Sequence, residues 1–329
     1  RMSSGYFKFN DKIVEFRVGQ SLAAALTEAG IFAFRHTPKG EERGLFCGMG
    51  VCQDCLLTVD GIPNRRACMT KATDGQNVEQ QVAFPALSNV PISPKAPTAR
   101  KLEPDVAIIG GGAGGLSAAI AARASGASVV VLDERKVGGG QYYKQAVGHY
   151  PLDDQQQEGA ALLSRAKESG AEIIGSVEIW GAFDGPLFLA ECNGAAYIIQ
   201  PKTAIISTGA YERPVMVPGW TLPGVMTTGA AQTLWRSYRT LPGQRVAVCG
   251  SGPLNAQLAL ELEKGGAEVT IMAESSPPPW RAPRTALKAA IADPALIVKG
   301  LLMLRDLKLR GVALHYRTRL KDIERNGNR

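Results

Sequence analysis

The sequence predicts an α+β domain followed by an α/β region: a β-grasp domain, then a Rossmann-type domain with a second nucleotide-binding domain. Two observations predict this fold class. Residues 6–29 read as strand, strand and helix ahead of a loop rich in glycine and cysteine, which is how a β-grasp begins. Farther on, a strand, a Gly-rich turn, a helix and a strand follow one another at 105–132 and again at 245–272, and each such unit belongs in a parallel sheet.

The chain is long enough for more than one domain. Its 329 residues exceed what one ordinary hydrophobic core holds, and a content of 45% apolar and 20% charged residues is typical of folded globular proteins. A proline-rich segment with the composition of a stiff linker separates the two regions. We expect a β-grasp domain over 1–84, the linker over 85–104, a Rossmann-type domain over 105–235 and a second, incomplete nucleotide-binding domain over 236–329.

The N-terminal region carries a local signal for each of its elements. Alternation of apolar and polar residues predicts short strands, and Ser21 is placed to cap the helix that follows them. The predicted elements are two strands within 6–17 around a turn at Asn10 and Asp11, a helix over Leu22–Ala29, a loop over 44–55, and strands over Leu56–Val59 and Arg66–Thr70.

The formal net charge of +7 does not point to a nucleic-acid ligand. Lysine and arginine are spread thinly, without a basic block interleaved with aromatic residues. A modest positive surface fits anionic cofactors or an acidic partner subunit better. The sequence also has no apolar run long enough to span a membrane and no secretory signal, so we expect no transmembrane segment and a cytoplasmic protein.

Four of the six cysteines lie close together, and their spacing indicates a metal site. Cys47, Cys52, Cys55 and Cys68 read C-x4-C-x2-C-x12-C, which is plant-type [2Fe–2S] spacing with an unusually close fourth ligand. Glycines between the first two cysteines leave room for the sulfides and let backbone N–H groups approach an anionic cluster. A tetrahedral zinc site is the alternative, because Cys52 and Cys55 alone would fit one, but the first spacing favours the cluster.

The first Gly-rich turn has the context of a dinucleotide-binding fingerprint, with a buried strand before it and a helix after it. Its glycines make the tight turn, let a pyrophosphate approach the backbone and allow the helix to pack on the strand, while the helix N-terminus neutralises the phosphates. An acidic residue at the end of the next strand should accept the ribose hydroxyls; Asp133 is the first choice and Glu134 the second. The other predicted dinucleotide contacts here are Gly110, Gly112, Ala113, Gly114 and Gly115.

The second Gly-rich turn is degraded. Gly250 and Gly252 stand where the first two glycines belong, but Asn255 replaces the third. Its side chain should push the helix and the strand apart, which weakens dinucleotide binding or alters the ligand. Ala273 takes the place of the acidic residue, with Glu274 beside it. NAD, NADP, another adenine nucleotide and an empty structural domain all remain open for this turn.

Beyond the first fingerprint the sequence resembles the two-dinucleotide flavoprotein superfamily. A Gly-Gly doublet and a glutamine follow the acidic residue, and a later apolar strand ends in Thr-Gly-Ala. In that superfamily both segments pass the FAD, so the resemblance implies that the dinucleotide is FAD. The implied FAD contacts are Gly139, Gly140, Gln141, Thr208, Gly209, Ala210 and Arg213. Because no Cys-x-x-Cys pair lies beyond residue 100, disulfide reductase activity is not expected.

The same resemblance implies that the second nucleotide-binding domain is inserted into the FAD domain. In the superfamily the chain then returns with a Gly-Asp motif that holds the flavin side of FAD. This sequence contains no Gly-Asp pair. We therefore expect a truncated chain, whose flavin site is completed by another polypeptide or by a missing segment.

The ferredoxin-like domain narrows the resemblance. The loop Cys47–Cys55, the Gly-Gly-Gln at 139–141, and segments 218–226 and 228–232 resemble the α subunits of hydrogen cyanide synthase, opine oxidases, proline and hydroxyproline dehydrogenases, and heterotetrameric sarcosine oxidase. In that group a β subunit with its own FAD and an amine-oxidase-like fold oxidises the C–N bond of an amino or imino acid. The resemblance implies an α subunit that passes electrons between FAD and a [2Fe–2S] cluster, with the small-molecule substrate bound by the partner.

Two other functions remain open. A stand-alone NAD(P)H-dependent reductase would use the second nucleotide domain to feed FAD, and a truncated chain would also suit a non-catalytic scaffold. No catalytic residue is predicted in this chain, because its three histidines lie apart in the sequence without a recognisable partner.

Overall fold

The protein is described by a computed structural model, which covers residues 4–86, 98–148, 150–281 and 283–325. The chain packs as two compact units. Unit 1 combines Arg1–Val90 with Glu212–Arg329, and unit 2 is Pro91–Tyr211. Residues 212–235, which our expected boundaries placed with 105–211, thus pack within unit 1.

Unit 1 begins with the β-grasp domain. Its elements are β1 (Ser4–Phe9), β2 (Lys12–Arg17), α1 (Leu22–Glu28), β3 (Arg35–His36), β4 (Glu42–Arg43), β5 (Leu56–Val59), β6 (Ile62–Arg66) and β7 (Asn77–Gln80). The sheet has the order β2-β1-β7-β5-β6, in which β1 and β7 run parallel and the other neighbours antiparallel. Side chains of β1 alternate between exposed and buried, so that Phe7 and Phe9 enter the core that α1 covers.

Most elements predicted for this domain are present, and Ser21 caps α1 as expected. The strand predicted over Arg66–Thr70 is wrong. Arg66 ends β6, and residues 67–70 form a turn, in which the N–H of Met69 donates to the carbonyl of Arg66 at 2.9 Å. The turn places Cys68 in the buried core of the domain.

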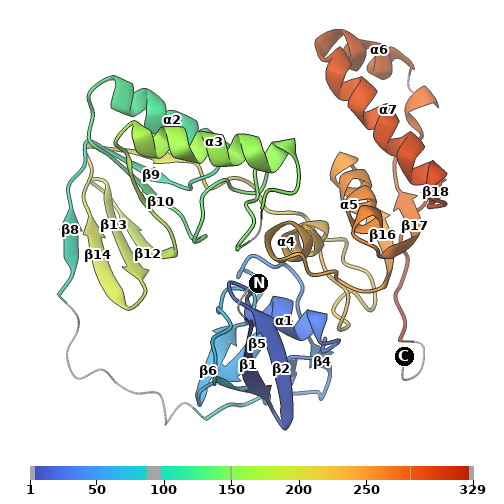
Figure 1. Cartoon of the computed structure of the whole chain (residues 1–329), viewed down its shortest axis with the longest axis horizontal. Helices are drawn as coiled ribbons and strands as arrows, with labels where there is room; N and C mark the ends of the chain where they lie inside the picture. The colour runs from blue at the N-terminus through green and yellow to red at the C-terminus, as the bar shows by residue number, and fades with distance from the viewer. Residues whose placement is uncertain (1–3, 87–97, 149, 282, 326–329) are drawn as a thin grey trace. The chain divides into compact units, whose positions relative to one another are not determined.

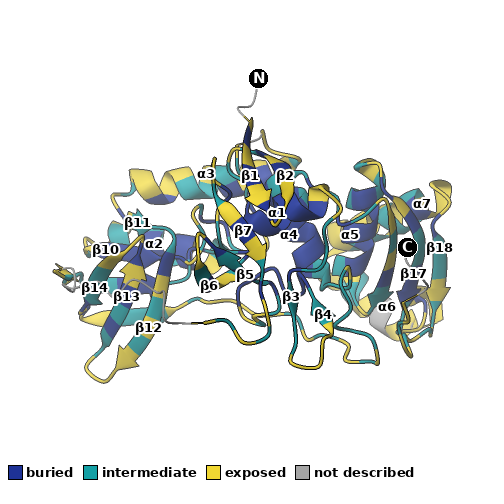
Figure 2. Ribbon diagram, turned by 90° about the horizontal axis from the view of Figure 1, so that it is seen from below, coloured by how far each residue is buried: buried dark blue, intermediate teal, exposed yellow. Residues whose placement is uncertain are grey.

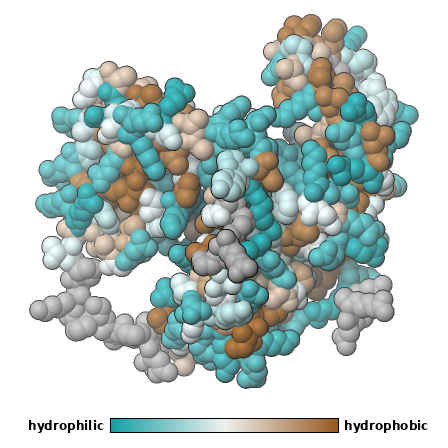
Figure 3. All heavy atoms as spheres, in the orientation of Figure 1, coloured by the Kyte–Doolittle hydropathy of each residue, from teal (hydrophilic) through white to brown (hydrophobic). Residues whose placement is uncertain are grey.

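The C-terminal part of unit 1 is a parallel sheet with helices. Its elements are α4 (Thr228–Tyr238), β16 (Arg245–Gly250), α5 (Pro253–Lys264), β17 (Glu268–Glu274), the 3-10 turn η1 (Pro279–Arg281), α6 (Pro283–Ala292), α7 (Pro294–Leu309) and β18 (Ala313–Tyr316). The strands lie in the order β16-β17-β18, and α5 and α7 pack together against them through Leu258, Leu262 and Leu307. Large apolar side chains remain at the surface over α6 and α7, as Figure 3 shows. None of the described helices is long and apolar enough to cross a membrane.

Helix α4 connects the two parts of unit 1. Leu234 enters the β-grasp core, while Ala231 enters the core of the C-terminal sheet. Both α4 and α1 are largely buried, and they lie next to each other in Figures 1 and 2. Arg236 is 0% exposed and pairs with Glu261 of α5 at 2.7 Å, which adds a buried ion pair to the apolar contacts.

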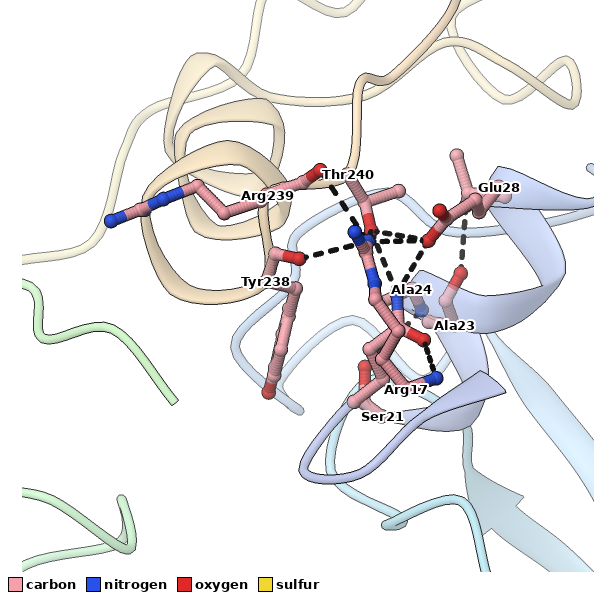
Figure 4. Close-up of polar contacts among 10 residues, drawn as sticks. Arg17, Ser21, Ala23, Ala24, Glu28, Tyr238, Arg239 and Thr240 are labelled. Atoms are coloured by element: carbon pink, nitrogen blue, oxygen red, sulfur yellow. Dashed lines mark hydrogen bonds and ion pairs between the residues drawn. The ribbon is translucent and has the colours of Figure 1, made fainter. Parts of the chain in front are cut away.

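Polar contacts at the C-terminal end of α4 complete this connection (Figure 4). Nη2 of Arg17 donates to Oε2 of Glu28 at 2.6 Å and to the carbonyl of Tyr238 at 3.1 Å. Nε2 of Gln20 donates to Oγ1 of Thr240 at 3.0 Å. The β-grasp domain and α4 are therefore joined by apolar packing and by hydrogen bonds across more than two hundred positions of sequence.

Unit 2 has three layers. Its elements are β8 (Arg100–Leu102), β9 (Val106–Ile109), α2 (Ala113–Ala124), β10 (Val129–Leu132), α3 (Asp154–Glu168), β11 (Glu172–Ile174), β12 (Val177–Phe183), β13 (Leu187–Cys192), β14 (Ala195–Ile199) and β15 (Thr203–Ile206). The parallel sheet β11-β10-β9-β15 packs with α2 on one face and with the second sheet, β12-β13-β14-β8, on the other. The predicted strand, turn, helix and strand at 105–132 are confirmed. Residues 100–102 of the predicted linker pair with β14, and 87–97 lie outside the described residues.

Candidate iron–sulfur and dinucleotide sites

The iron–sulfur loop, residues 44–55, connects β4 to β5 and carries three of the four clustered cysteines. Gly48 and Gly50 have φ angles of 64° and 77°, which glycine adopts without strain. These bends fold the loop toward Cys68 in the turn after β6. Cys47, Cys55 and Cys68 are buried and Cys52 is partly exposed. The structure thus brings all four predicted cluster residues together.

The four thiols are arranged as two pairs. The thiol of Cys52 donates to Sγ of Cys47, which lowers the pKa of Cys47 to about 5 and raises that of Cys52. The thiol of Cys68 donates to Cys55 in the same way, which lowers the pKa of Cys55 and raises that of Cys68. In each pair the hydrogen bond between the thiols therefore favours the thiolate of one sulfur.

The pairing of the thiols matches the ligand arrangement of a [2Fe–2S] cluster. A [2Fe–2S] cluster takes two thiolates on each of two irons, whereas structural zinc takes four ligands around one ion. Within the described ranges, no group of three or more His, Cys, Asp or Glu side chains is arranged to hold one metal ion. Two pairs of thiols match the two irons of a [2Fe–2S] cluster.

Backbone N–H groups of the loop point at the sulfurs. The N–H groups of Met49 and Cys52 donate to Sγ of Cys47 at 3.4 and 3.5 Å, and that of Asp54 donates to Sγ of Cys52 at 3.5 Å. Such donors stabilise thiolates, and hydrogen bonds to sulfur are one of the determinants of a cluster's reduction potential. The loop therefore supplies the electrostatic environment that an anionic cluster needs.

The iron–sulfur loop packs against the first turn of α4. The carbonyl of Phe46 accepts the N–H of Thr227 at 3.0 Å, and the ring of Phe46 meets that of Trp220 edge-on at 4.8 Å between centroids. A Cβ on Gly48 would lie 2.9 Å from Cα of Ala230, so this approach requires glycine. Trp220, Thr227 and Ala230 therefore contact the loop, which no local signal in the sequence indicates.

The first Gly-rich turn has the geometry of a dinucleotide fingerprint. Gly110 has a φ of 106°, and a Cβ on Gly115 would lie 1.9 Å from the carbonyl oxygen of Gly110. Ala113 and Gly114 form the start of α2, whose first N–H groups are the anion-binding end of the helix. Gly112 caps α2 without a side chain, which leaves the backbone open to a phosphate.

The acidic residues after β10 occupy different environments. Asp133 is buried, and its oxygens accept the N–H of Gly111 at 2.5 Å and the N–H of Arg135 at 2.6 Å. Burial raises the pKa of Asp133, although these hydrogen bonds oppose that effect. Glu134 is exposed. Asp133 therefore holds the Gly-rich turn itself, and Glu134 is the more accessible carboxylate.

The Gly-Gly doublet lies against the first fingerprint. The N–H of Gly139 donates to the carbonyl of Gly111 at 2.7 Å, and a Cβ on Gly140 would lie 2.8 Å from Cα of Gly112. Nε2 of Gln141 donates to the carbonyl of Ala210 at 2.9 Å.

Unit 2 thus brings together most of the dinucleotide contacts that the sequence predicts. The doublet and Gln141 join the fingerprint to the segment that holds Thr208, Gly209 and Ala210. Arg213 belongs to unit 1.

At the second Gly-rich turn an acidic residue, Glu274, accepts hydrogen bonds from the backbone. Gly250 and Gly252 have φ angles of 151° and 109°. Glu274 accepts the N–H groups of Gly252 and Ser276 at 2.9 Å each. Burial alone would raise the pKa of Glu274, but these hydrogen bonds outweigh burial and lower it. Asn255, expected only to push the helix away, is buried and bonded to Thr228 of α4 at 2.7 Å.

Comparison with known protein families agrees with this geometry. The pattern of the 2Fe-2S iron-sulfur cluster binding domain matches residues 6–83, and that of the pyridine nucleotide-disulphide oxidoreductases matches residues 104–328. The predicted cofactors, a [2Fe–2S] cluster and FAD, are thereby confirmed for the domains of this chain.

Several curated proteins are similar over part of the chain. One of the subunits of opine oxidase from Agrobacterium tumefaciens is 40% identical over 88 residues, which cover 27% of this chain and 18% of that protein. The HcnB subunit of hydrogen cyanide synthase from Pseudomonas aeruginosa is 38% identical over 118 residues, which cover 36% of this chain and 25% of that protein. The matched segments thus span a quarter or less of these relatives.

A solved structure shares the fold over nearly the whole chain. L-proline dehydrogenase from P. horikoshii superposes with a TM-score of 0.70 at 21% identity, covering 99% of this chain and 56% of that one. The predicted fold class, a [2Fe–2S] domain followed by a FAD- and nucleotide-binding oxidoreductase fold, is confirmed. By the match over residues 104–328, the chain belongs to the pyridine nucleotide-disulphide oxidoreductase family.

Proposed function

We propose that this chain is the electron-transfer subunit of a multi-subunit, flavin-dependent dehydrogenase or oxidase that acts on the CH–NH or CH–NH2 group of an amino or imino acid. One observation carries the proposal: the same chain holds two cysteine pairs suited to a [2Fe–2S] cluster and a domain of the pyridine nucleotide-disulphide oxidoreductase family. Such a pair of cofactors converts two-electron chemistry at a flavin into single-electron transfer at iron. The similarity to subunits of opine oxidase and hydrogen cyanide synthase supports the substrate class.

Within this function, Cys47 and Cys52 hold one iron, and Cys55 and Cys68 hold the other. The cluster, when bound, supplies one-electron transfer. The chain's part is to position four sulfurs as thiolates, and the two backbone N–H groups that donate to Sγ of Cys47 favour the thiolate that iron requires. Phe46 and Trp220 shield the loop on one side, which lowers the local dielectric around it.

The FAD contacts follow from the geometry of unit 2. Gly110, Gly112 and the start of α2 receive the pyrophosphate, and the doublet at 139–140 closes on it. We assign the ribose contact to Glu134, because Asp133 is buried and accepts two backbone N–H groups.

Two matched variants test this assignment. Glu134→Gln should weaken FAD binding roughly tenfold while leaving stability unchanged, since the ribose hydroxyl then donates to a neutral amide oxygen and no longer to a charged carboxylate. Asp133→Asn should instead lower the free energy of unfolding by about 1–3 kcal/mol, because a buried backbone N–H loses its acceptor. Fluorescence titration with FAD and chemical denaturation separate the two effects. Weaker FAD binding in Asp133→Asn, with unchanged binding in Glu134→Gln, would assign the ribose contact to Asp133.

The substrate-oxidising step belongs to a partner in this proposal. The partner is a FAD-containing β subunit with an amine-oxidase-like fold, which binds the amino or imino acid. Co-expression tests this directly. The complex should reduce the iron–sulfur cluster of this chain when the amino or imino acid is added without oxygen, and the isolated chain should not. Reduction of the isolated chain by the substrate would contradict the division of labour.

A second candidate is a reductase that takes hydride from NADH or NADPH. The second turn favours it, because Gly250 and Gly252 keep the backbone conformation of a fingerprint and Glu274 lies beside them. An adenine nucleotide there would contact the same backbone. Anaerobic NADH separates the candidates: bleaching of the flavin in the isolated chain supports the reductase, and no change supports the electron-transfer subunit.

A further inference from the structure

Asn255 departs from the fingerprint, and the structure gives it a specific partner. Its Oδ1 accepts a hydrogen bond from Oγ1 of Thr228 at 2.7 Å, and the asparagine is only 6% exposed. Thr228 is the first residue of α4. The amide fits beside the turn because Gly250 has no side chain: a Cβ there would lie 2.9 Å from Nδ2 of Asn255. A glycine at this position would leave Thr228 without its acceptor on α5.

The turn of α4 that Asn255 holds is also the turn that contacts the iron–sulfur loop. Thr227, immediately before Thr228, donates its N–H to the carbonyl of Phe46 at 3.0 Å. Ala230 packs on Gly48 closely enough to exclude a Cβ. Phe46 and Gly48 are the two chain neighbours of Cys47. Residues 227–230 therefore connect Asn255 to both sides of that cysteine.

The rest of α4 is fixed without Asn255. The buried pair of Arg236 with Glu261, and the packing of Leu234 in the β-grasp core, hold the middle and the end of the helix. Loss of the Asn255 hydrogen bond should therefore loosen the first turn while leaving unit 1 assembled. This separates an effect on the iron–sulfur loop from a general loss of folding.

We propose that Asn255 is a positioning residue for the iron–sulfur cluster: through Thr228 it fixes the turn of α4 that supports the backbone on both sides of Cys47. This inference rests on the proposed function, because it takes Cys47 as a cluster ligand. The positioning role also explains why the second Gly-rich turn has asparagine in place of its third glycine. The side chain at this position holds α4 beside the iron–sulfur loop, which a glycine could not do.

The test compares Asn255→Ala, Thr228→Val and the double variant with the wild-type chain. The first readout is the EPR spectrum and the midpoint potential of the reconstituted cluster, which should shift in both single variants. The second is the rate at which iodoacetamide labels Cys47 in the metal-free chain, with Cys192 of unit 2 as internal reference. That rate should rise about fivefold in each single variant, the factor expected when one side-chain hydrogen bond is lost from a local equilibrium.

The double variant and two controls identify the cause. If the residues act through one hydrogen bond, the double variant should be no more reactive than either single variant. Asn255→Asp keeps an acceptor for Thr228 and should restore the wild-type spectrum. Lys264→Ala, at the exposed end of α5, should change nothing.

The outcomes separate this inference from the proposed function. A cluster with wild-type EPR, together with wild-type labelling of Cys47 in Asn255→Ala and Thr228→Val, would overturn the positioning role alone. Independent, additive effects of the two substitutions would overturn it as well. A wild-type chain that takes up no iron would overturn the proposed function.

Discussion

Replacement of Gly48 by alanine tests the contact between the iron–sulfur loop and α4. The substitution carries two costs. A φ of 64° is unfavourable for alanine by about 1–2 kcal/mol. The new Cβ would also lie 2.9 Å from Cα and 3.0 Å from Cβ of Ala230, an overpacking that costs about 1–3 kcal/mol. Gly48→Ala should therefore lower the free energy of unfolding of unit 1 by about 2–5 kcal/mol.

Gly40→Ala is the matched control. Gly40 has a similar φ of 79°, but no described atom lies within 4 Å of the position its Cβ would take. Gly40→Ala should therefore lower the free energy of unfolding only through the backbone conformation, by about 1–2 kcal/mol. Guanidinium denaturation followed by circular dichroism gives the two values, and iron retained per chain shows whether the loop still holds the cluster. Equal losses in the two variants, or full iron retention in Gly48→Ala, would refute the packing of α4 on this loop.

Two further predictions concern ion pairs. Arg236→Ala should lower the free energy of unfolding by about 3–5 kcal/mol, because Glu261 is left charged and nearly buried. Arg245→Ala, which breaks an exposed pair, should lower it by less than about 1 kcal/mol. Denaturant titration compares the two variants, and similar losses of stability would contradict the burial argument. Lys202, with Ser128, holds the pKa of Asp105 well below its usual range. This stabilisation is present above the unfolded-state pKa of about 4 and is lost as pH falls below it, so Asp105→Asn should flatten the acid side of the melting temperature profile.

The sequence predicted the elements that depend on local signals. The two strand, turn, helix and strand units, the cap at Ser21 and the gathering of three cysteines on one loop all follow from residues close in sequence. The strand predicted over Arg66–Thr70 failed because a turn also suits such a short segment, and hydrogen bonds to the carbonyl of Arg66 favour the turn.

Contacts between distant segments could not be predicted in this way. The apolar residues of α4 predict that the helix is buried, but they do not predict which domain covers it. The structure shows that α4 packs on both parts of unit 1. Thr228 and Asn255 are separated by 27 positions and lie in different elements, so nothing local pairs them. Asp133 and Glu134 are adjacent in sequence and equally acidic, and only the fold shows which one is committed to the backbone of the turn.

Iron and acid-labile sulfide, quantified together with the EPR spectrum of the dithionite-reduced chain, test the central claim most directly. Two cysteine pairs that each hold one iron predict two irons and two sulfides per chain, with the signal of a reduced [2Fe–2S] cluster. Cys68→Ser, which alters one ligand of the second pair, should lose or change that signal while the FAD absorption remains. One zinc per chain and no labile sulfide would contradict the claim.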